Sequence, residues 1–102
     1  MRKPNINLQT GLDARYDLVK PMLDKGHIEK MSDIFKYVPK TLFFRDLGYR
    51  VDRGDQLIER PDGFIVRKLF EIARNCSLKE EEVLILMVNE YRYQKEKKTP
   101  PL

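Results

Sequence analysis

The chain has 102 residues, of which 41% are hydrophobic and 35% are charged, with a formal net charge of +4. This length suits one domain with a single modest core, and this composition excludes an intrinsically disordered chain. The longest apolar run, residues 83–88, is far shorter than the ~20 residues of a membrane span. The opening MRKPNINLQT has no signal-peptide core, and one cysteine cannot form an intrachain disulfide. We therefore expect a cytoplasmic protein without a membrane segment.

The basic excess lies mainly at the two ends of the chain, at Arg2, Lys3, Lys95, Lys97 and Lys98. Residues 40–60 include five basic and four acidic residues, so the net charge of this segment is only +1. Charge fits an anionic partner but does not by itself identify a nucleic-acid-binding protein.

The first elements read as an arm followed by two helical segments. Residues 1–12 are expected to form a flexible N-terminal arm. Asp13 then caps a short helix that Pro21 interrupts and Gly26 ends. A second helix is predicted from apolar residues at helical spacing, and Pro39 stops it; the apolar positions are Ile28, Met31, Phe35 and Val38.

Two short helices should follow. Thr41 is a suitable N-cap for the first, and Gly48 suits the left-handed residue that ends it. The next helix is predicted over 51–59 and is closed by the turn sequence at residues 61–63.

The last part of the domain should contain two longer helices. The first presents an i, i+3, i+4, i+7 stripe to the core, made of Val66, Leu69, Phe70 and Ala73. Ser77 and Glu80 have the spacing of a capping box, which places the start of the final helix at residue 78 or 79. This helix should end near Gln94, so the domain spans 13–94 and a basic tail spans 95–102.

The run VLILMV at 83–88 permits two interpretations. A helix that is apolar on all sides needs cover on all sides, so it is either a central core helix or a helix that also pairs with a second copy. In the second case the homodimer forms through residues 83–91.

Residues with reactive side chains have structural explanations. His27 has no cluster of metal ligands around it in sequence, and Cys76 has no partnering histidine and is expected to be a buried thiol. Glu80, Glu81 and Glu82 fit the first turn of a helix, where negative charge complements the dipole. Phe43, Tyr37 and Tyr49 are interpreted as core or core-edge residues rather than as a stacking platform for bases. We predict no enzyme, cofactor or metal.

Five segments in order carry a family resemblance: LVKPMLDKGHI, DIFKYVPKT, DLG, VDRGDQL and FIVRKLFEIA. With them, residues 19–91 resemble the phage-repressor-like (Cro/XRE-type) helix-turn-helix family, and in particular a group of small uncharacterised bacterial regulators. The resemblance implies an all-α, five-helix lambda-repressor-like domain. It also implies sequence-specific binding to double-stranded DNA as a transcriptional regulator, as a homodimer.

In such a unit the helix at 51–59 enters the major groove and the preceding helix crosses the DNA backbone. The resemblance implies that bases are read by Arg50, Val51, Asp52, Arg53 and Gln56. Arg53 suits guanine and Gln56 suits adenine. Phosphate contacts are implied for Lys40, Thr41 and Arg60, which lie at helix ends.

Other features leave a second function open. Asp52 and Asp55 bring negative charge to the base-reading helix, and Arg50 and Arg53 are able to pair with Asp46, Asp52 or Asp55 on a solvated face. The alternative is a helix-turn-helix relic that works as a protein-interaction or dimerisation module.

Phe44 and Gly54 stand where the family usually has a small residue and a large residue, respectively. These two positions face each other across the crossing of the two helices. We predict that the ring of Phe44 fills the space that the missing side chain of Gly54 leaves, since volume-conserving exchanges are the best-tolerated changes in a core.

Overall fold

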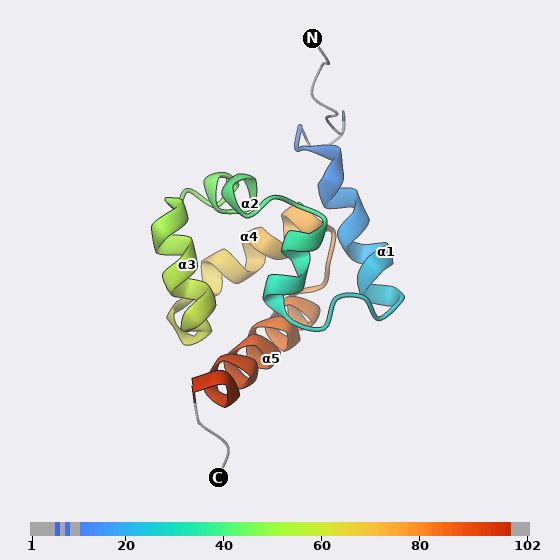
Figure 1. Ribbon diagram of the computed structural model, residues 1–102. Coiled ribbons are helices and arrows are strands. Elements are labelled where there is room, and N and C mark those ends of the chain that lie inside the picture. Colours follow the sequence, from blue (N-terminus) through green and yellow to red (C-terminus); the bar gives the residue numbers. More distant parts are fainter. Residues whose placement is uncertain (1–5, 7, 9–10, 99–102) are drawn as a thin grey trace.

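The computed structural model describes residue 6, residue 8 and residues 11–98. Within these residues the chain forms five α-helices and three 3-10 helices and no strand (Figure 1). The one extended pairing there is a single antiparallel bridge between Ile6 and Asp13. The predicted all-α class is therefore confirmed. Of the predicted arm, residues 1–5, 7, 9 and 10 lie outside the described residues.

The first helical segment consists of the 3-10 helix η1 (Ala14–Leu18) and the helix α1 (Val19–Asp24). Asp13 caps η1 as predicted: its carboxylate accepts the N–H of Arg15. Pro21, however, does not interrupt the helix. It lies in the first turn of α1, where a backbone N–H has no helical partner and its absence costs little.

The second segment is the 3-10 helix η2 (Met31–Lys36) rather than an α-helix. Ile28, Met31 and Val38 are buried as their spacing predicts, and Phe35 is partly buried. The carboxylate of Asp33 accepts the N–H groups of Glu29 and Lys30, so the segment is held by a side chain as well as by its own backbone.

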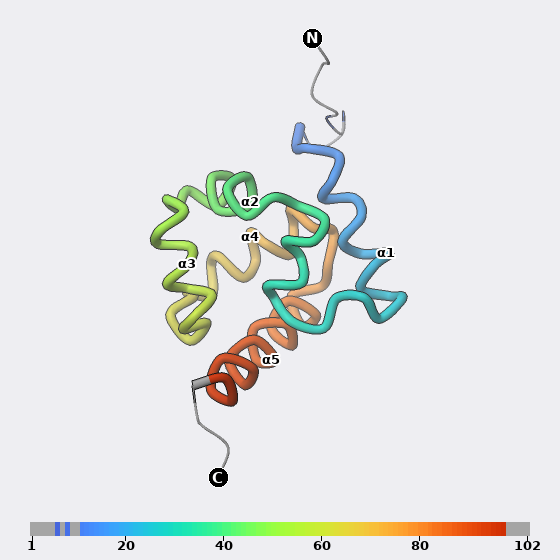
Figure 2. Tube along the Cα trace, viewed as in Figure 1, coloured from blue at the N-terminus to red at the C-terminus, as the bar shows by residue number. Residues whose placement is uncertain are grey.

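The helices α2 (Lys40–Asp46) and α3 (Val51–Glu59) follow with a short turn between them (Figure 2). Gly48 has φ +81°, as predicted for the residue that ends α2. The prediction of Thr41 as the N-cap is wrong, because α2 already begins at Lys40 and Thr41 lies inside its first turn. Pro39 takes the N-cap position, and its fixed φ and missing N–H suit the start of a helix. The predicted turn after α3 is the 3-10 helix η3 (Pro61–Gly63).

The helix α4 (Val66–Cys76) presents a different face to the core from the predicted one. Val66 and Phe70 are 68% and 51% exposed. The stripe that packs inward has the same spacing, shifted by three residues, and consists of Leu69, Ile72, Ala73 and Cys76. Two apolar stripes overlap in this sequence, and the packing of α5 and η1 against α4 decides between them.

The helix α5 (Glu80–Lys98) begins and ends later than predicted. Ser77 has φ +57° and ends α4, so it cannot also cap α5. The residue before α5, Lys79, instead donates its N–H to the carboxylate of Glu82, which replaces the predicted Ser77–Glu80 box. The three glutamates do lie in the first turn. Helix continues through 95–98 of the predicted tail, and 99–102 lie outside the described residues.

The α5 helix is the element against which η2, η3, α3 and α4 pack. It also carries a buried carboxylate. Glu90 is fully buried and accepts hydrogen bonds from the N–H of Ser32 at 2.8 Å and from the side chain of Gln94 at 2.8 Å. Both bonds compensate for the removal of this charged group from water, and the first one ties α5 to the start of η2.

The VLILMV run is divided between the core and the surface. Val83, Leu86 and Met87 are buried, whereas Leu84, Ile85 and Val88 are between 39% and 58% exposed. The core interpretation therefore holds for one side of the helix only. No helix in the described part of the chain has the length and apolarity to cross a membrane.

Candidate nucleic-acid interface

The crossing of α2 and α3 is built around the pair Phe44 and Gly54. The ring of Phe44 is fully buried, and α3 stays helical through Gly54, whose N–H bonds to the carbonyl of Arg50 at 2.9 Å. A Cβ built on Gly54 would overlap Cγ, Cδ2 and Cε2 of the Phe44 ring. The prediction that the ring of Phe44 fills the space beside Gly54 is thus confirmed.

The C-terminal end of α2 is fixed by several bonds. The N–H groups of Gly48 and Tyr49 bond to the carbonyls of Arg45 and Phe44, at 2.9 and 2.8 Å, in the pattern of a Schellman motif. The ammonium group of Lys68 on α4 donates to the carbonyl of Leu47, where it also complements the helix dipole. The turn that leads into α3 is therefore rigidly anchored.

A buried tyrosine links η1 to the same helix. The hydroxyl of Tyr16 donates to the carboxylate of Asp46 at 2.7 Å. Burial, and then this bond to a carboxylate, raise the pKa of Tyr16 well above its ordinary value. The orientation of α2 is consequently held from three sides, by α3, α4 and η1.

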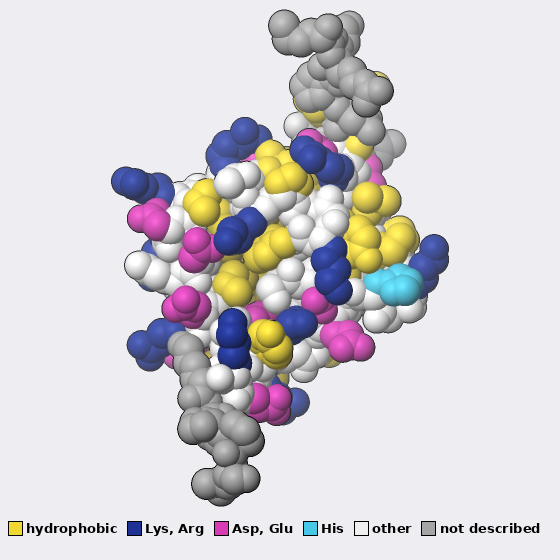
Figure 3. Space-filling view, in the orientation of Figure 1, with side chains coloured by type: hydrophobic (Ala, Val, Ile, Leu, Met, Phe, Trp, Pro, Cys, Tyr) yellow, Lys and Arg dark blue, Asp and Glu magenta, His cyan; other side chains and the backbone are white. Residues whose placement is uncertain are grey.

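The exposed surface of α3 consists of two parallel stripes. The polar stripe contains Arg53, Gln56 and Arg60, at i, i+3 and i+7. The acidic stripe beside it contains Asp52, Asp55 and Glu59, at the same spacing and also exposed. The left-hand side of the molecule in Figure 3, where α3 lies, accordingly shows Lys and Arg side chains mixed with Asp and Glu.

The predicted base-reading residues lie together along α3. Arg50 is its N-cap and its side chain is 90% exposed, with its guanidinium 3.5 Å from the carboxylate of Asp52. Val51 is partly buried. Nη1 of Arg53 donates to Oε1 of Gln56 at 3.2 Å, so these two side chains form a connected polar pair. Pairing of Arg50 with Asp52, left open by the sequence, is therefore present, but on a highly exposed face.

The predicted phosphate-contacting residues are more widely spread. Nζ of Lys40 lies 2.6 Å from the carboxylate of Asp55, so the start of α2 is paired to the acidic stripe of α3. Thr41 is exposed in the first turn of α2, and Arg60 is exposed at the C-cap of α3. Arg60 borders a hollow of about 400 Å³ that Arg53 and Gln56 also line.

One basic residue near this surface was not among the predicted contacts. Arg45 on α2 has a side chain that is 74% exposed and lies 3.6 Å from Asp46. Arg45 lies in the last turn of α2, where a basic residue complements the helix dipole.

The remaining reactive residues lie away from α3. His27 is exposed, and Cys76 is fully buried, which raises the pKa of its thiol from the ordinary 9.0 to about 12. In the described part of the chain, His, Cys, Asp and Glu side chains form no group of three able to hold a metal ion. Phe43 is a core residue, and Tyr37 and Tyr49 lie at the edge of the core as predicted.

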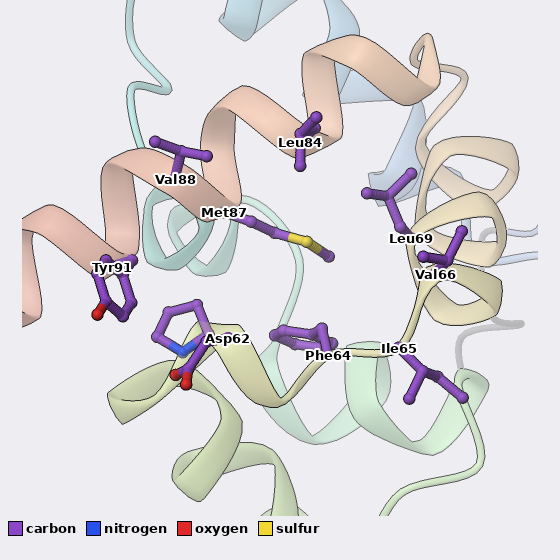
Figure 4. A pocket seen from close by; sticks show the side chains of 10 residues that line it. Asp62, Phe64, Ile65, Val66, Leu69, Leu84, Met87, Val88 and Tyr91 are labelled. Carbon is purple, nitrogen blue, oxygen red and sulfur yellow. The ribbon is translucent and has the colours of Figure 1, made fainter.

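A second surface feature is an apolar groove between α5 and the start of α4, with a volume of about 320 Å³. Leu84, Val88 and Tyr91 form its α5 side, and Ile65 and Val66 form its other side. Figure 4 shows Met87 pointing from α5 across this groove towards Phe64. The sequence indicated the α5 side through VLILMV, but Val66 on the other side was predicted to face the core.

Comparison with known proteins adds no relative to these observations: no protein-family model, curated protein or solved structure matches this chain significantly.

Proposed function

We propose that this protein is a small transcriptional regulator that binds double-stranded DNA through its α2–α3 unit, with α3 in the major groove. The observation that carries the proposal is the α2–α3 crossing, in which the fully buried ring of Phe44 fits the space at Gly54. This fit fixes α3 while its polar stripe faces solvent. A rigid helix with exposed Arg53 and Gln56 is suited to contact base edges.

Phosphate contacts would orient the domain in this arrangement. Thr41 and Arg60 are exposed near the ends of α2 and α3, and Lys40 is the third candidate. To reach a phosphate, Lys40 must leave the carboxylate of Asp55, and the exchange of one anion for another limits what this lysine contributes to affinity. A second copy bound through residues 83–91 belongs to the same proposal, because two half-sites are usually read by a dimer.

The first experiment is a fluorescence titration of the protein against random duplex DNA at several salt concentrations. We expect a dissociation constant in or below the range of about 10⁻⁴ to 10⁻⁶ M, which rises steeply with salt because phosphate contacts release counterions. No salt-dependent binding below ~100 μM would contradict the proposal.

A matched pair of variants then tests the assignment of roles. On a DNA site selected for tight binding, Arg53→Ala should reduce the binding free energy by about 1–3 kcal/mol and relax the base preference at one base pair. Lys40→Ala should weaken binding to all DNA sequences about equally. It should also lower the slope of the logarithm of the binding constant against the logarithm of the salt concentration by about one. If both variants behave alike, α3 does not read bases.

The alternative function, a protein-interaction module, has its own supporting observation. The exposed charged residues of α3 and its two caps balance: Arg50, Arg53 and Arg60 stand against Asp52, Asp55 and Glu59. Such a surface repels phosphates as much as it attracts them. Absence of DNA binding together with stable self-association in sedimentation would favour this alternative.

A further inference from the structure

We infer that two copies of this chain associate through an antiparallel pair of α5 helices, each helix lying beside the apolar groove of the other copy. The inference rests on the homodimer part of the proposed function and specifies how the two copies meet. The inference does not depend on DNA binding. Three observations on α5 support it: an exposed seam, an apolar groove beside that seam, and opposite charges at the two ends of the helix.

The seam consists of Leu84, Val88, Tyr91 and Lys95, which follow one another at intervals of four, three and four residues. This is the spacing with which a helix contacts a partner helix along its whole length. Leu84 is 51% exposed and Val88 and Tyr91 are each 39% exposed. Nζ of Lys95 lies over the ring of Tyr91, 5.3 Å from its centroid, so the aliphatic part of this lysine continues the apolar seam.

The groove extends the seam sideways into a wider apolar surface. Its far side consists of Ile65 and Val66, which are 49% and 68% exposed at the start of α4. Together with Leu84, Val88 and Tyr91 of the seam they line one apolar groove, which the charged Asp62 borders (Figure 4). Apolar areas of this kind on a small domain mark contact surfaces, because exposure to water is unfavourable for each of these side chains.

The charges at the ends of α5 select the second copy as the occupant. Glu80 and Glu81 are exposed in the first turn, and Arg92 and Lys95 are exposed in the last turns. When two α5 helices run antiparallel with their centre between Val88 and Tyr91, the acidic start of each lies beside the basic end of the other. The same surface patch then serves both copies, as two-fold symmetry requires.

A parallel pair would place like charges together at both ends, which is unfavourable, and it would also align the two helix dipoles. The antiparallel pair places Val88 against Tyr91 of the partner subunit and Leu84 against the stem of the partner's Lys95. The polarity of α5 therefore determines the direction of the pairing, and its apolar seam provides the driving force.

Oxidative cross-linking tests the direction. An affinity-tagged L84C variant and an untagged K95C variant are mixed, oxidised and separated by mass. We expect a cross-link between tagged and untagged chains in the mixture, and little cross-linking in L84C alone. Native Cys76 does not interfere, because it is fully buried. Efficient cross-linking of L84C alone would mean a parallel pair, and no cross-link in any sample would mean no pair; either result overturns the inference.

Sedimentation equilibrium with charge-reversed variants provides the second test. E81K should raise the dissociation constant of the dimer at least tenfold, and the double variant E81K/K95E should restore it. Val88→Glu should give monomers, whereas its matched control Leu18→Glu, at an exposed apolar position on η1, should leave the dimer intact. A wild-type chain that stays monomeric at high micromolar concentration contradicts the inference. If that chain still binds DNA, only the dimer is wrong.

Discussion

Phe44 and Gly54 occupy one shared volume at the crossing of α2 and α3, so a change at either position depends on the other. Gly54→Ala should destabilise the wild-type protein by about 1–3 kcal/mol, because the new Cβ overlaps the Phe44 ring. In a Phe44→Ala background the same change should stabilise, since the ring is gone and alanine favours helix by about 1 kcal/mol over glycine. Urea unfolding of the four proteins measures this sign reversal.

Phe44→Ala alone should lower the free energy of unfolding by about 3–5 kcal/mol, which is a large share of the total for a small domain. Phe44→Leu is therefore prepared in parallel, so that a folded background is available in any case. Equal effects of Gly54→Ala in all backgrounds would mean that the two positions do not interact.

Cys76 gives a prediction about alkaline pH. Burial raises the pKa of its thiol from 9.0 to about 12. Above pH 9 this thiol therefore ionises in the unfolded chain but stays protonated in the folded one. The free energy of unfolding should be unaffected by this group below pH 9 and should fall as the pH rises towards 12. Cys76→Ala should remove part of that fall, and Tyr16→Phe another part, since the pKa of Tyr16 is also raised.

Thiol reactivity provides an independent check. At pH 8 the wild-type protein should react with Ellman's reagent slowly in buffer and rapidly in urea, because reaction needs an exposed thiolate. A native protein that reacts as fast as the unfolded chain would show that Cys76 is accessible.

At the level of elements, the contact between α5 and η2 depends on the buried carboxylate of Glu90. Glu90→Ala should cost at least about 1–3 kcal/mol, because it leaves the N–H of Ser32 without a partner in a buried place. Glu90→Gln keeps an acceptor at the same position and should cost clearly less. Thermal unfolding of both variants measures this difference, and equal losses would show that the Ser32 bond is not what matters.

The elements were largely predictable from the sequence, because strong local signals ended them. Gly48 and the turn at 61–63 fixed the ends of α2 and α3. Two of the failed predictions have a common cause, which is that the same residues suited two different roles. Ser77 suited the cap of α5 but ends α4, and the apolar residues of α4 suited two faces. Tertiary packing decided both cases, and no local pattern contains that information.

The candidate site was less predictable, because side-chain partners depend on elements that meet only in the folded chain. The pair Lys40–Asp55 joins α2 to α3 and was not predicted, although both residues had been considered separately. The pairing of Arg50 with Asp52 was predicted as one of several options, since the two residues are near neighbours in sequence.

For the whole molecule, the position of negative charge matters more than the net charge of +4. Neutralising the acidic stripe with D52N/D55N/E59Q should tighten binding to random duplex DNA at 0.15 M salt. Screening acts over about 8 Å at this concentration, so only nearby carboxylates repel the phosphates strongly. The control D24N/E29Q/E96Q changes the net charge equally at exposed positions off α3 and should have a much smaller effect.

Titrations of the two triple variants under identical conditions measure this difference. Equal gains in affinity for both variants would mean that α3 is not the surface that contacts DNA. The assignment of the base-reading residues would then be wrong.

The crossing of α2 and α3 also has a consequence for the detection of distant homologues. A sequence profile scores each column independently, so it would penalise this chain twice against the small residue and the large residue that the family resemblance leads us to expect at positions 44 and 54. The packing at this contact constrains the sum of the two side-chain volumes, which a pairwise score retains and a column score discards. Relatives of this chain should therefore be sought with a covariation criterion, in which bulk lost at one of these positions is accepted when it is gained at the other.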